Sequence, residues 1–196
     1  QEEFEKDPEM FLSSINHEIA HDEYFTLDAK QQKEVTDLFL QDAGLQDILK
    51  RFASAFYADK LKLGTETAGD SYLRTHDVKN KATTENTLTP EGQKGLKDAR
   101  SIVFELNGKK REVLVGLLIT ELVSYMSSFE ISQSVFDKVA ENGRSVRGGD
   151  DPRYDAVKMC HDYIRNKPKI SSQLEKFKLL GRKPEIEKIF TDLFKK

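Results

Sequence analysis

The sequence predicts an all-α protein: about eight helices in a single globular assembly around a central apolar helix. Two observations indicate this class. Apolar residues recur at helical spacing along most of the chain, and each of the five prolines stands where a helix could begin. No segment gives a clear strand signal.

The first 62 residues predict three helices, which form an N-terminal helical subdomain. In the first helix, Phe11, Ile15 and Ile19 are spaced at i, i+4 and i+8. The second follows Asp28, a residue type that caps helix N-termini. The third carries the longest apolar stripe, formed by Leu45, Ile48, Leu49, Phe52, Phe56 and Leu61.

Residues 63–88 are polar and rich in threonine, and predict a long loop or linker. This segment would separate residues 1–62 from a C-terminal helical subdomain, residues 89–196, within one compact domain. Such long loops are uncommon, and those that occur are often functional or disordered.

The C-terminal subdomain predicts a helix from Pro90 to Leu106, ended by Asn107-Gly108. Residues 112–129 are the most apolar segment of the chain, which predicts a helix buried on most sides. Shorter helices are then expected over residues 132–142, 152–165, 171–180 and 184–194.

Charge and composition limit the function classes. The net charge of −3 gives no basic footprint for nucleic acid, and no run of about 18 apolar residues predicts a transmembrane segment. Residues 165–196 hold ten bases against four acids in an amphipathic pattern. The apolar residues of this basic end could pack into the protein core. Alternatively, the segment could make peripheral contact with an anionic membrane or bind an acidic partner. The single cysteine, Cys160, cannot form an internal disulfide.

One motif carries specific chemistry. Residues 17–21 read His-Glu-Ile-Ala-His, and on a helix His17 and His21 lie on one face, where both imidazoles can bind one zinc ion. These five residues resemble the core motif of the zincin metallopeptidases. The resemblance implies zinc as cofactor and Glu18 as the general base that activates a water molecule.

The residues around the motif argue against a catalytic zinc site at His17 and His21. In the extended zincin motif a glycine and a third histidine follow, but this chain has Tyr24 and Leu27 there, and Glu34 is the nearest alternative ligand. At about 100° per residue, the stripe of apolar residues on this helix points away from the histidines. We therefore expect both imidazoles to face water.

A second resemblance concerns residues 88–96, Leu-Thr-Pro-Glu-Gly-Gln-Lys-Gly-Leu. This segment is similar to the Leu-Thr-x-Glu-x-x-Lys segments of nematode fatty acid- and retinol-binding proteins, which are secreted, all-helical proteins. The resemblance implies secretion and an internal cavity for an acyl chain. The residues expected at such a cavity, which could equally fill a solid core, are Phe52, Phe56, Leu118, Leu122 and Met126.

The sequence thus favours a non-enzymatic helical binding protein, whose target is a small apolar ligand such as a fatty acid, or a protein partner. The alternative is a zinc-dependent metallopeptidase or hydrolase that uses His17, Glu18 and His21.

Overall fold

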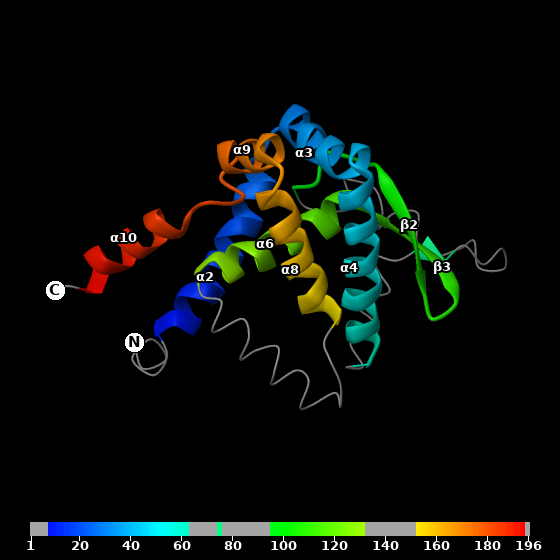
Figure 1. Cartoon of the computed structure of the whole chain (residues 1–196), viewed down its shortest axis with the longest axis horizontal. Coiled ribbons are helices and arrows are strands. Elements are labelled where there is room, and N and C mark those ends of the chain that lie inside the picture. The colour runs from blue at the N-terminus through cyan, green and yellow to red at the C-terminus, as the bar shows by residue number, and fades with distance from the viewer. Residues whose placement is uncertain (1–7, 63–73, 76–94, 132–151, 195–196) are drawn as a thin grey trace. The chain divides into compact units, whose positions relative to one another are not determined.

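The computed structural model describes residues 8–62, 74–75, 95–131 and 152–194 (Figure 1). These residues are mainly helical, which confirms the predicted fold class. The described helices are α2 (Pro8–Thr26), α3 (Ala29–Gln41), α4 (Ala43–Lys62), α6 (Val115–Ile131), α8 (Pro152–Arg165), α9 (Pro168–Lys176) and α10 (Lys183–Phe194). The strands are β1 (Arg74–Thr75), β2 (Ser101–Leu106) and β3 (Lys109–Leu114).

Three helices begin at a proline, as the sequence predicts, although the helix expected over residues 171–180 begins at Pro168 and ends at Lys176. Pro8, Pro152 and Pro168 are the first residues of α2, α8 and α9, because proline at this position gives up an amide that has no partner within the helix. Asp28 caps α3: its carboxylate accepts the Gln31 amide at 2.8 Å, while the Gln31 side chain accepts the Asp28 amide at 2.9 Å.

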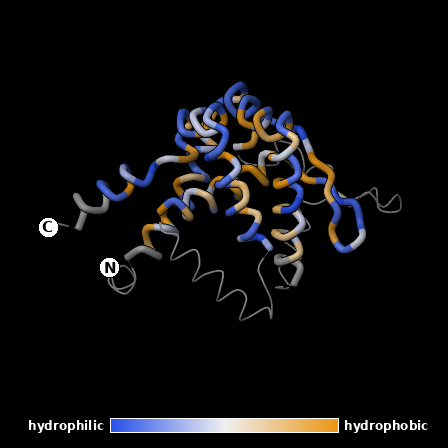
Figure 2. The backbone as a smooth tube through the Cα atoms, viewed as in Figure 1, coloured by the Kyte–Doolittle hydropathy of each residue, from blue (hydrophilic) through white to orange (hydrophobic). Residues whose placement is uncertain are grey.

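The helix predicted from Pro90 to Leu106 is wrong over residues 95–106, while residues 90–94 lie outside the described residues. Residues 101–114 form an antiparallel hairpin of β2 and β3, and β1 pairs with the other edge of β3. Asn107 and Gly108 have φ angles of 54° and 71°, which suit a tight two-residue hairpin turn. The residues of β2 alternate between exposed and buried, so one face of the strand packs inward. The tip of the hairpin is hydrophilic, whereas β2 carries hydrophobic residues (Figure 2).

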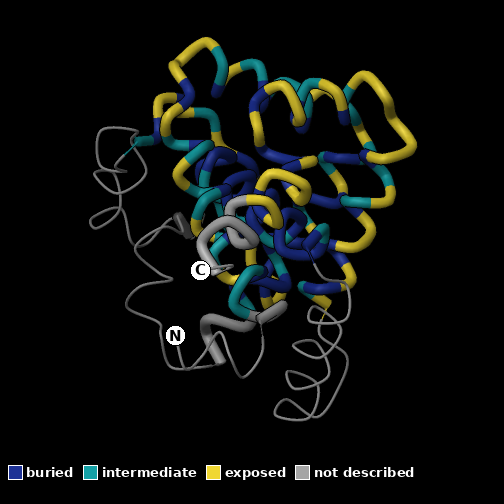
Figure 3. The backbone as a smooth tube through the Cα atoms, turned by 90° about the vertical axis from the view of Figure 1, so that its left-hand side faces the viewer, coloured by how far each residue is buried: buried dark blue, intermediate teal, exposed yellow. Residues whose placement is uncertain are grey.

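The predicted central helix is confirmed as α6. It begins at Val115 rather than near residue 112, because residues 109–114 belong to β3. Leu118, Leu122 and Met126 are each fully buried, as expected of the most apolar helix in the chain. The other helices carry buried and exposed residues in turn along their length, as amphipathic helices do (Figure 3).

The chain divides into two compact units. Residues 1–24 and 121–196 form one, here called the end unit, and residues 25–120 form the other, the middle unit. The end unit has buried residues of α6 and α8 in its core, among them Val123, Cys160 and Ile164. In the middle unit, α4 packs beside β2, and the rings of Tyr57 and Phe104 stack 5.9 Å apart.

Two further sequence predictions concern particular segments. Of the predicted linker at residues 63–88, the structure describes Arg74 and Thr75 alone, which form β1, and the helix expected at 132–142 lies outside the described residues. Among the described helices, none is both long enough and apolar enough to cross a membrane.

Candidate functional site

Within the end unit, α2 and α6 contact each other through small polar residues. The Ser13 hydroxyl donates to the Ser128 carbonyl at 3.4 Å, and the Ser128 hydroxyl donates to the Ser13 carbonyl at 3.0 Å. One turn along α2, the Asn16 amide donates to the Ser127 carbonyl at 2.9 Å. These bonds satisfy buried polar groups, which allows a polar face of α2 to pack inward.

The expectation that His17 and His21 face water is therefore wrong. Both histidines are half-buried, and Ile15 and Ile19 of the apolar stripe are no more than half-buried themselves. Between Phe11 and Tyr24, the buried residues of α2 are Ser13, Asn16, Ala20 and Tyr24. A helical wheel that ranks residues by apolarity misses this buried face of α2. Its polar side chains, Ser13 and Asn16, donate hydrogen bonds to backbone carbonyls of α6.

The two histidines meet a carboxylate from α6. The Nε2 atoms of His17 and His21 are 3.2 Å apart, and the His21 Nε2 lies 3.9 Å from a carboxylate oxygen of Glu121. One ligand atom from each of the three side chains lies within 4.8 Å of the other two. Among the described residues, this is the one group of three or more His, Cys, Asp or Glu side chains with such spacing.

Glu121 is the residue that sequence reasoning missed. It follows His21 by one hundred positions, and no local motif marks it as a ligand. Glu34, the carboxylate suggested by the sequence, lies in the middle unit and is not part of the cluster. Glu18 is exposed on α2, directly after His17.

The environment of His17 keeps its imidazole neutral. Burial, together with the nearby His21, lowers the pKa of His17 to about 4, and a hydrogen bond with the backbone of Ser124 partly offsets this shift. The Tyr125 ring packs edge-on against the imidazole, with the ring centroids 4.8 Å apart. A neutral imidazole is the form that binds metal ions.

The separation of the two histidine nitrogens suits a metal ligand set, whereas the Glu121 oxygen, 3.9 Å from the His21 Nε2, would have to move closer to complete it. Two nitrogens bound to zinc at 2.0–2.1 Å with tetrahedral geometry are about 3.3 Å apart, close to the separation of the two Nε2 atoms. Two histidines and a glutamate are also a ligand set found in catalytic zinc sites, where a water molecule takes the fourth position.

The five residues expected at an apolar cavity are all buried. Phe52 and Phe56 lie on α4 with their rings stacked 5.4 Å apart, and Leu118 belongs to the same middle unit. Leu122 and Met126 belong to the end unit. Binding of an apolar ligand by these residues stays a prediction.

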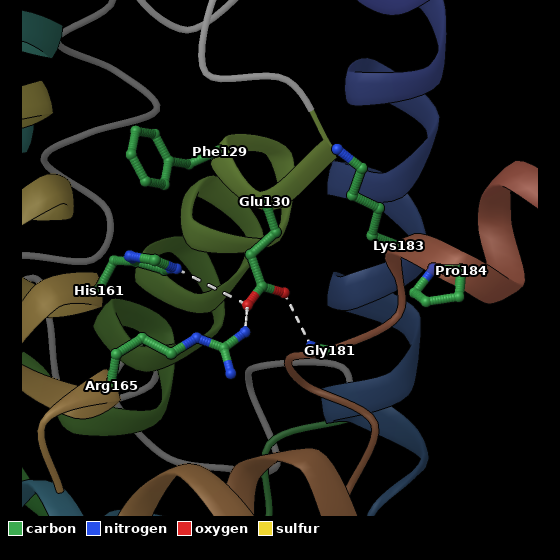
Figure 4. Close-up of a pocket in the computed structure, with 7 residues that line it drawn as sticks. All are labelled: Phe129, Glu130, His161, Arg165, Gly181, Lys183 and Pro184. Atoms are coloured by element: carbon green, nitrogen blue, oxygen red, sulfur yellow. Dashed lines mark hydrogen bonds and ion pairs between the residues drawn. The ribbon is translucent and has the colours of Figure 1, made fainter.

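A cavity of about 520 Å³ lies elsewhere in the end unit, between α6, α8 and the start of α10 (Figure 4). Glu130 points into it and is held from three sides: His161 at 3.7 Å, the Gly181 amide at 2.7 Å, and the guanidinium of Arg165. Burial by itself would raise the pKa of Glu130, but its bonds to His161, Gly181 and Arg165 together lower it below the ordinary value.

Cys160, next to His161, takes no part in this cavity. It is fully buried, and burial raises the pKa of its thiol. A thiol of this kind is a poor nucleophile.

No protein-family model, curated protein or solved structure matches this chain. The two resemblances drawn from the sequence therefore stay predictions, and a function has to be argued from the site itself.

Proposed function

We propose that the protein binds a zinc ion through His17, His21 and Glu121 and acts as a zinc-dependent hydrolase. The observation that carries the proposal is the meeting of the three side chains, from two helices, with one ligand atom of each within 4.8 Å of the others. The non-enzymatic binding function that the sequence favours stays a prediction beside this proposal.

The protonation state of His17 supports metal binding. Because the pKa of His17 is about 4, no proton has to be removed from it at neutral pH. The hydrogen bond between His17 and the backbone of Ser124 also supports the site, because such a bond fixes the ring orientation of a ligand histidine.

The number and exposure of the ligands favour hydrolysis over a purely structural role. Structural zinc sites are closed by four protein ligands, whereas the part of the chain that the structure describes brings three together here. The side chains of His21 and Glu121 are 18% and 27% exposed, so water can reach the site. If bound, a zinc ion would lower the pKa of a water molecule at the site, and Glu18, next to His17 in the chain, would be the candidate to accept the proton.

Metal analysis of the purified protein tests the ligand set. We expect about one zinc per chain, lost in His17→Ala and bound at least about tenfold more weakly in Glu121→Gln. Glu34→Gln is the matched control, because it removes the carboxylate that is outside the cluster, and its zinc content should equal that of the wild type. Equal zinc affinity in Glu121→Gln and Glu34→Gln would refute the proposed ligand set.

Hydrolysis is tested separately with a fluorogenic peptide library. Glu18→Gln should retain zinc but lose about 100-fold or more in rate, as expected when a general base is removed. If zinc binds and Glu18→Gln is as active as the wild type, or no peptide or ester is cleaved, the metal site is real but is not hydrolytic.

A further inference from the structure

We infer that the cavity beside Glu130 binds a small organic anion through the oxygens of a carboxylate or phosphate group. This site is distinct from the proposed zinc site. Glu121 and Glu130 are nine residues apart on α6, and at about 100° per residue they project from opposite faces of the helix. The inference therefore does not depend on zinc binding.

The acidic group in the cavity is already largely satisfied. One oxygen of Glu130 faces both His161 and Arg165, and the other accepts the amide of Gly181. Figure 4 shows these three groups converging on the carboxylate from different sides. Arg165 and Gly181 each donate to one oxygen of Glu130, with His161 at 3.7 Å, so part of its acceptor capacity is already used.

Hydrogen-bond donors, in contrast, are in excess. Arg165 carries five N–H groups, and its polar contacts are with Glu130 and, at 2.8 Å, with Glu175. Lys183 has three N–H groups, and its ion pair with Glu187, the one found among the described residues, is 3.8 Å long, beyond hydrogen-bond distance. A cavity rich in donors selects a ligand rich in acceptors.

The charge balance of the lining residues also favours an anionic ligand. Arg165 and Lys183 are positive and Glu130 is negative, so these three lining residues leave one formal positive charge. The outer partners, Glu175 and Glu187, have side chains 42% and 54% exposed. Exposed ion pairs of this kind are weak and can be displaced by a ligand anion.

Size and lining favour an organic ligand over a bare ion. The cavity volume of about 520 Å³ lies within the range typical of small-molecule sites. Phe129 and Pro184 contribute apolar surface, on which the carbon skeleton of a ligand can rest (Figure 4).

The test uses three ligands that share one ring and differ in their polar group: benzoate, phenyl phosphate and neutral benzyl alcohol. Binding is followed by NMR at the Gly181 amide and the Arg165 side-chain N–H of the full chain. We expect saturable shifts with benzoate or phenyl phosphate, and the tighter of the two identifies the preferred anion. Equal binding of benzyl alcohol, or the absence of saturation with both anions, would overturn the inference.

Two variants with opposite expected effects strengthen the test. Lys183→Gln removes a positive charge and should weaken anion binding by about threefold to tenfold. Glu130→Gln removes the negative charge while keeping an acceptor for Gly181, and should tighten binding by about twofold or more.

Lys169→Gln is the control, since Lys169 is exposed on α9 and does not line the cavity. The amide spectrum of each variant verifies its fold. Equal weakening by Lys183→Gln and Lys169→Gln would show that the anions follow general surface charge, and would contradict the proposed site.

Discussion

His17 shows how far the environment of a single residue can shift its chemistry. Its motif is visible in the sequence, and its helical spacing from His21 is as predicted. The neutral state of the His17 imidazole and its contact with Tyr125 depend on α6, a helix about one hundred positions later in the chain. The position of the histidines could be predicted from local spacing, but their burial and the third carboxylate could not.

The lowered pKa of His17 predicts a loss of stability in mild acid. In the unfolded chain His17 takes up a proton near pH 6.5, whereas in the folded chain it does so near pH 4. The unfolded state therefore binds more protons in this window, and the free energy of unfolding should fall by about 2–3 kcal/mol between pH 7 and pH 4.5.

Urea unfolding of the metal-free protein, with a chelator present, measures this change. In His17→Gln the decrease should be smaller by most of that amount, while in Asp155→Asn, an exposed position on α8, it should be retained. The same pH dependence in wild type and His17→Gln would show that other groups are responsible.

The hairpin is the element on which local reasoning failed. Asn-Gly both ends helices and forms tight hairpin turns, and the apolar residues between Ala99 and Leu106 fit helical spacing as well as alternation. Pairing with β3 decides between helix and strand, because each residue of β2 lies opposite a residue of β3, such as Phe104 opposite Arg111. Helix starts could be predicted because proline acts locally, but strand pairing depends on a second segment.

Gly108→Ala should destabilise the protein by about 1 kcal/mol. A methyl group at Gly108 would meet nothing within 4 Å, so the cost arises from its φ angle of +71° and not from a clash. Asn107→Gly, at the neighbouring turn position with φ of 54°, serves as the comparison and should change the stability by less. Thermal unfolding of both variants measures the difference, and an unchanged melting temperature in Gly108→Ala would contradict the turn geometry.

For the whole molecule, the sequence predicts the fold class and the buried central helix. The division into two compact units could not be predicted in this way, because the end unit joins residues 1–24 to residues 121–196, which are far apart in the sequence. Long-range contacts such as those of Ser13 with Ser128 and of Glu23 with Arg182 hold these distant segments together. Each residue in such a pair looks like an ordinary polar residue in its own stretch of sequence, so the pairing has no local signature.

The lone cysteine gives the end unit its own chemical reporter. The Cys160 thiol is fully buried on α8, and its raised pKa keeps it protonated at neutral pH. Reagents such as 5,5′-dithiobis(2-nitrobenzoic acid) should therefore modify it only when the unit opens. Labelling should be slow in buffer and fast in urea, in step with the loss of helical circular dichroism. Rapid labelling of the native protein would contradict the packing around α8. The rate of colour development would then report the opening of this unit alone, because Cys160 is the one cysteine in the sequence.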